Sequence, residues 1–133
     1  MRYYRPVSLI LGIIFAAVGL VFLFGTDIVL TFFNDLSEHL GMLTTPVNDI
    51  GFYPLLAVGY MYLVTILAFR MYLHPENTTY PLLLTHGKLA SSILSMALFL
   101  IHERYLIYIT NFAVDGFIAV VVLLFYLGMK KNT

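Results

Sequence analysis

The sequence contains no cysteine and no tryptophan, and only 11% of its 133 residues are charged. The absence of cysteine excludes disulfides, thiolate metal sites and cysteine nucleophiles. The shortage of charge excludes an ordinary water-facing surface, because about a quarter of the residues in soluble domains are charged. Seven basic residues balance seven acidic ones. No basic field is therefore available to attract nucleic acid, and we expect no nucleic-acid partner.

The residues that are present are mainly apolar, at 61% of the chain. They form four stretches near the length of about 20 residues that a membrane-spanning helix needs. These candidate spans cover about residues 7–24, 52–73, 81–101 and 106–129. Arg2 and Arg5 precede the first stretch as in a signal peptide, but the apolar run continues to Phe24, so we interpret it as a retained span. The sequence predicts an all-α bundle of four transmembrane helices in one membrane domain, residues 1–133.

The segment between the first two spans predicts one further helix, over about residues 27–41. Its apolar positions share one helical face and its polar positions share the other. The apolar face contains Ile28, Phe32, Leu36, Leu40 and Leu43, and the polar face contains Thr31, Asn34, Asp35 and Glu38. We expect an amphipathic helix at the membrane interface. Because its polar face is acidic, anionic lipid cannot be what holds it there. It is either a simple connector or a lid over an opening in the bundle.

The basic residues predict the orientation of the spans. With a cytoplasmic N-terminus, the inner side collects Arg2, Arg5, Arg70, Lys130 and Lys131, whereas the outer side holds Arg104. This asymmetry follows the rule that cytoplasmic loops are enriched in lysine and arginine. We therefore expect an inner (cytoplasmic) membrane protein of a bacterium or archaeon with both termini in the cytoplasm.

Two ionisable residues lie inside the predicted spans, Lys88 in the third and Asp115 in the fourth. A charge near mid-membrane costs roughly 2.5 to 3.5 kcal/mol on insertion scales, so such residues need partners. The third and fourth spans are antiparallel, and a rise of about 1.5 Å per residue places the two side chains at depths that a lysine can bridge. The sequence predicts that Lys88 and Asp115 form a pair.

Further polar residues extend this pair into a seam. Ser92 and Ser95 follow Lys88 at helical spacing, and Tyr108 and Asn111 precede Asp115 in the same way. Tyr60 and Tyr62, near the middle of the second span, each need a partner for the hydroxyl. We expect one or the other of them, with Ser91 and Thr110, to lie beside the seam. Three interpretations stay open: a structural ion pair that sets helix register, a binding or translocation site, or an active site with Lys88 or Asp115 as acid or base.

No catalytic residues and no metal site are predicted. The four histidines, His39, His74, His86 and His102, show no clustered spacing. We therefore expect neither haem nor metal, and the residues identify no cofactor.

The layout of the chain resembles a known group. Gly12 and Gly19-Leu20 in the first helix, Leu23-Phe24 after them, an irregular outer segment and three further spans joined by tight turns resemble the small DoxX-like four-helix membrane proteins. Some members of that group are similar to quinone-linked oxidoreductase subunits. The resemblance implies an accessory membrane subunit, and it assigns no site residues.

Taken together, these features predict a non-catalytic integral membrane protein. Its expected role is that of an accessory subunit, or of a binding module for a lipid-like molecule, a quinone or a partner membrane protein. The expected partners are membrane lipids and either a partner membrane subunit or a second copy of the chain. The alternative is a small proton-coupled transporter that works as an oligomer, with Asp115 as the proton carrier.

Overall fold

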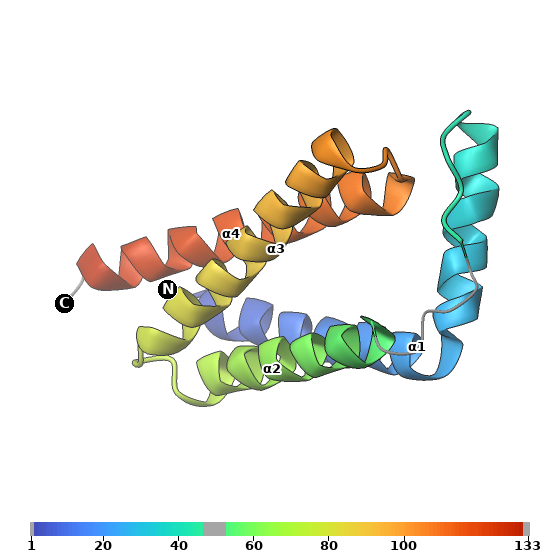
Figure 1. Ribbon diagram of the computed structural model, residues 1–133. Helices are drawn as coiled ribbons and strands as arrows, with labels where there is room; N and C mark the ends of the chain where they lie inside the picture. The colour runs from blue at the N-terminus through green and yellow to red at the C-terminus, as the bar shows by residue number, and fades with distance from the viewer. Residues whose placement is uncertain (1, 47–52, 132–133) are drawn as a thin grey trace.

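The computed structural model describes residues 2–46 and 53–131, and within them the chain forms four helices (Figure 1). These are α1 (Tyr4–His39), α2 (Tyr53–Leu73), α3 (Thr79–Ile101) and α4 (Leu106–Lys131). Each contains a segment long and apolar enough to cross a membrane. The predicted all-α class with four candidate spans is therefore confirmed. Outside the helices, the described residues contain one isolated parallel bridge, between Leu43 and Tyr105.

Local sequence explains where the middle helices end and begin. α2 stops at Leu73, one residue before His74-Pro75, because the residue that precedes proline disfavours helical geometry. α3 begins at Thr79, whose backbone N–H donates to the side chain of Asn77 at 2.9 Å. Pro81 lies in the first turn of α3, where its missing N–H costs little. The resulting turn is short, so α2 and α3 run in opposite directions.

The helices are arranged as two pairs. α1 packs along α2 and α3 packs along α4, whereas α1 and α4 make few contacts with each other. Figure 1 shows the two pairs close together near the chain termini and further apart towards the α3–α4 turn. Small residues permit the close approach of α1 and α2. A Cβ atom at Gly12 would lie 3.1 Å from the Phe69 ring, and one at Gly19 would lie 3.2 Å from Met61.

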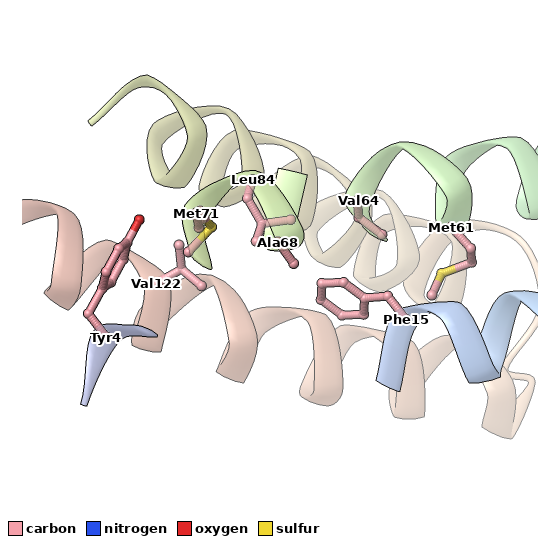
Figure 2. Close-up of a cluster of buried hydrophobic side chains, with 8 residues drawn as sticks. All are labelled: Tyr4, Phe15, Met61, Val64, Ala68, Met71, Leu84 and Val122. Atoms are coloured by element: carbon pink, nitrogen blue, oxygen red, sulfur yellow. The ribbon is translucent and has the colours of Figure 1, made fainter. Parts of the chain in front are cut away.

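A cluster of buried apolar side chains joins all four helices (Figure 2). It consists of Tyr4 and Phe15 from α1, Met61, Val64, Ala68 and Met71 from α2, Leu84 from α3 and Val122 from α4. Most other large apolar side chains on the helices face outward, including Phe24, Phe117 and Ile101. A small interior with an apolar exterior is what a lipid solvent requires, since lipid tails are as apolar as leucine.

The helix predicted over residues 27–41 is not a separate element. Residues up to His39 continue α1 across a kink at Gly25, whose backbone angles (φ −141°, ψ 36°) are not helical. The first span was predicted to end near residue 24, but Gly25 bends the helix without ending it. We call residues 26–39 the α1 arm. Figure 1 shows the arm turned away from the axis of the first half of α1.

Two contacts hold the chain that follows the arm. The Asn34 amide donates to the Thr45 carbonyl at 2.9 Å and accepts from the Thr45 backbone N–H at 2.7 Å. The bridge between Leu43 and Tyr105 then connects this segment to the start of α4. The faces of the arm differ in exposure, because Leu30 and Ser37 are buried while Ile28 and Phe32 are exposed.

The close contact at Gly12 predicts a position-specific loss of stability. Gly12→Leu should destabilise the protein by about 1 to 3 kcal/mol, because the added side chain meets the Phe69 ring and forces α1 and α2 apart. Gly59→Leu is the matched control, since nothing lies within 4 Å of a Cβ at Gly59. Thermal unfolding in mild detergent measures both variants, and an equal midpoint for the two would contradict the close α1–α2 packing.

Candidate functional site

A buried ion pair lies at the centre of the bundle. Lys88 Nζ on α3 is 2.8 Å from Asp115 Oδ1 on α4, which confirms the predicted contact. The two residues are 3% and 4% exposed. Pairing is what makes these charges tolerable in an apolar interior, because an isolated charge there would pay its full desolvation cost.

The Lys88 ammonium also contacts aromatic rings from the other helix pair. It lies 4.5 Å from the ring centroid of Phe15 on α1 and 5.1 Å from that of Tyr60 on α2. The faces of such rings attract cations, most strongly where water is excluded. One ammonium group on α3 therefore interacts with side chains from each of the other three helices. The role of Phe15 was not predicted, because nothing in the sequence distinguishes it from the other phenylalanines of the apolar spans.

Hydrogen bonds extend the pair along α3 and α4. The Asn111 amide donates to the hydroxyl oxygens of Ser91 at 3.0 Å and Ser95 at 2.6 Å. The Ser92 hydroxyl donates to the Phe112 carbonyl at 2.8 Å. A Cβ atom at residue 116 would lie 3.0 Å from the Ser92 oxygen, so glycine at this position keeps α3 and α4 close. The structure thus brings Ser92, Ser95 and Asn111 together as predicted.

The two predicted tyrosines have different positions. Tyr60 lies at the ion pair, and its hydroxyl oxygen is buried. Ser91 lies close to this hydroxyl, yet the hydroxyl makes no hydrogen bond of acceptable distance and angle within the described residues. Tyr108 is on the predicted side of α4, but its ring packs against Tyr105, with the ring centroids 5.5 Å apart.

A cavity of about 300 Å³ opens beside the ion pair, and we call it the polar cavity. Its polar lining consists of Tyr60, Lys88, Ser91, Asn111 and Asp115. Its apolar lining consists of Ile14, Phe15, Val18 and Phe22 from α1, Ala57 and Met61 from α2, and Val114 and Ile118 from α4. All five polar groups were expected in the seam or beside it, whereas the contribution of α1 was not predicted.

A second cavity, of about 630 Å³, adjoins the first. We call it the apolar cavity, because Thr110 and Asn111 are the only polar residues among the described side chains that line it. The remaining lining comes from Ala17, Val18, Val21 and Phe22 before the kink, Ile28, Val29, Phe32 and Phe33 in the α1 arm, and Ile107 and Val114 of α4. The kink at Gly25 thus places residues from both halves of α1 around the apolar cavity.

The two cavities share part of their walls. Val18, Phe22, Asn111 and Val114 line both. Together the cavities form a groove between α1 and α4, the two neighbouring helices that contact each other least. We call it the α1–α4 groove. It is apolar at the arm and polar at the ion pair.

The four histidines lie outside the lining of the polar and the apolar cavity. Among the described residues, no group of three or more His, Cys, Asp or Glu side chains is arranged to hold a metal ion. His39 bonds to the carbonyl of Asp35 within the arm, and His74 lies 3.6 Å from Glu76 in the α2–α3 turn.

The fold and the site together define a small all-helical protein with four candidate membrane spans and a buried ion pair at the end of an apolar groove. No family model, no curated protein and no solved structure matches the chain.

The ion pair predicts strong energetic coupling between its partners. Lys88→Met or Asp115→Leu alone should destabilise the protein by about 3 to 5 kcal/mol, because each change leaves the other charge buried without a partner. The double variant should recover much of that loss, since apolar replacement of a buried pair is often neutral. Denaturant titration in detergent gives the coupling free energy. Additive single effects would show that the pair contributes no interaction of its own.

Proposed function

We propose that this chain is a non-catalytic integral membrane protein that binds a lipid-like molecule, a membrane lipid or a quinone, in the α1–α4 groove. The observation that supports this most directly is the joining of the two cavities. An amphipathic molecule has an apolar chain and a polar head, and the groove has an apolar region that leads to a polar one. Ligand sites commonly have this composition, with mostly apolar walls and a few convergent polar groups.

The size and the position of the groove support the same proposal. The volumes of about 300 and 630 Å³ lie within the usual range of ligand pockets. The groove also lies where α1 and α4 contact each other little. A ligand dissolved in the bilayer would therefore reach it from the side, without crossing the packed α1–α2 or α3–α4 interfaces.

A role without catalysis fits the chemistry of the groove. Lys88 and Asp115 neutralise each other, and the serine hydroxyls of the described seam donate or accept structural hydrogen bonds. A nucleophile with its base and a set of oxyanion donors would be needed for acyl or phosphoryl transfer. An accessory role beside a partner membrane subunit, or in a homo-oligomer, accords with this chemistry and with the layout resemblance to DoxX-like proteins.

Proton-coupled transport is a second candidate function. It is favoured by one observation: Asp115 is buried and also lines the polar cavity. A carboxylate in such a position could take up a proton if Lys88 moved away. Asp115 is already engaged with Lys88 at 2.8 Å, so we rank transport below ligand binding.

The proposal includes a placement in the membrane. The exposed face of the α1 arm, with Ile28 and Phe32, would lie at the outer interface, and Asp35 and Glu38 would face water. The distribution of lysine and arginine supports an orientation with both termini on the cytoplasmic side of a bacterial or archaeal inner membrane. In this position the arm forms one wall of the groove near the membrane surface.

Filling the groove tests the binding proposal. Val114→Trp should displace the bound molecule, because Val114 lines both cavities. Val120→Trp is the matched control on the same helix, since the two valines are 51% and 53% exposed and Val120 lines neither cavity. Native mass spectrometry after purification in gentle detergent measures the bound mass. We expect an adduct of lipid or quinone mass with the parent chain and with Val120→Trp, and its loss with Val114→Trp.

An adduct of equal abundance in both variants, or none in the parent chain, would contradict binding in the groove. A companion protein of defined mass in the same spectrum would identify the partner of an accessory subunit.

Single cysteines test the orientation without background, because the chain has no native cysteine. Glu38→Cys lies on the exposed side of the α1 arm, and Glu76→Cys lies in the exposed α2–α3 turn. In intact cells, a membrane-impermeant maleimide should label residue 38 and leave residue 76 unlabelled until the membrane is opened. The reverse pattern would invert the proposed topology.

A further inference from the structure

The polar cavity has no net charge. Lys88 and Asp115 carry opposite charges and are in contact, and the other described residues that line the cavity are uncharged. This balance constrains the molecule that can occupy the space. An anionic headgroup would bring a second negative charge next to the Asp115 carboxylate, and a cationic one would bring a second positive charge next to Lys88. Either would bury an uncompensated charge in an apolar surrounding, which is strongly unfavourable.

The polar cavity also has an unused hydrogen-bond donor. Tyr60 lines the cavity, and its buried hydroxyl makes no hydrogen bond of acceptable geometry within the described residues. Other polar groups of the seam are already engaged, because the Asn111 amide donates to Ser91 and Ser95 and the Ser92 hydroxyl donates to a backbone carbonyl. A buried donor without an acceptor is costly, so a ligand that supplies an acceptor oxygen would remove that cost.

From these two features we infer the class of ligand: an uncharged amphiphile whose headgroup presents a carbonyl oxygen to the Tyr60 hydroxyl, with its apolar chain in the apolar cavity. This inference rests on the proposed function, and it adds the charge and the hydrogen-bonding character of the head. Tyr60 is the specificity-determining residue. The ion pair disfavours ligands with a charged headgroup, and the Tyr60 hydroxyl favours a headgroup that carries a hydrogen-bond acceptor.

The absence of native tryptophan permits a direct binding assay. Phe22→Trp places one tryptophan where it lines both cavities. It exchanges one aromatic ring for another and adds much less volume than Val114→Trp, so the groove stays open. Bromine atoms on a bound acyl chain quench the fluorescence of a nearby tryptophan. Three probes share one dibrominated stearoyl-length chain and differ in the head: the methyl ester, the free acid and the primary amine. At about pH 8 the acid is ionised and the amine is protonated. Phe117→Trp, on an exposed part of α4 away from the groove, reports non-specific quenching in the detergent micelle.

The methyl ester should quench the Phe22→Trp reporter at concentrations about tenfold lower than the acid or the amine. Adding Tyr60→Phe should weaken ester binding by about tenfold, as expected for the loss of one buried hydrogen bond. Tyr62→Phe is the matched control, because Tyr62 is on the same helix and 68% exposed. Its ester affinity should equal that of the parent reporter.

Two competitors distinguish the possible sources of the carbonyl. Displacement of the ester by dioleoylglycerol would identify a glycerolipid ester, and displacement by decylubiquinone would identify a quinone. Failure of both to displace it would contradict the inferred class.

The outcomes separate this inference from the proposed function. Binding of the acid or the amine as tightly as the ester, or an ester affinity insensitive to Tyr60→Phe, would overturn the inferred headgroup while leaving a lipid-like ligand in the groove. Quenching no greater at residue 22 than at residue 117 for every probe would overturn the proposed function itself.

Discussion

The contact between Lys88 and Asp115 is the constraint on which the interior of this protein depends. Two opposite charges in an apolar bundle are tolerable only when they meet, and they meet only if α3 and α4 have the right register. The hydrogen bonds of Asn111 and Ser92 act at the same interface. The close approach at Gly116 adds to them. The register of α3 and α4, the charge balance of the interior and the polar end of the groove therefore all depend on the contact between Lys88 and Asp115.

The shape of the groove has a different origin, in the bend of α1. A straight α1 would continue past the bundle along its own axis, whereas the kink at Gly25 turns residues 26–39 aside (Figure 1). The apolar cavity is lined on both sides of this bend and by α4. The contacts of Asn34 with Thr45 and of Leu43 with Tyr105 connect the far end of the arm to α4. Backbone geometry at one glycine thus creates a cavity that the ion pair alone would not.

Much of this architecture could be predicted from residue patterns. The apolar stretches correspond to helices because a bilayer leaves few other ways to satisfy the backbone. The pairing of Lys88 with Asp115 followed from depth along two antiparallel helices, which depends only on the rise per residue. The seam residues Ser92, Ser95 and Asn111 followed from helical spacing. Tyr108 shares that spacing, but its ring packs against Tyr105. Helical spacing predicts the face on which a residue lies, but it does not determine which residue its side chain contacts.

The sequence alone determined that the chain is helical, that its helices are apolar enough to span a membrane and that two charges must find each other among them. Those properties depend on composition and on periodicity within single helices. Only the tertiary structure decided that Phe15 and Tyr60 cover the Lys88 ammonium. It also decided that the residues after Gly25 continue α1, and that two cavities join between α1 and α4. These features depend on the angles at which whole helices cross and bend, and the packing of many weakly selective apolar contacts sets those angles.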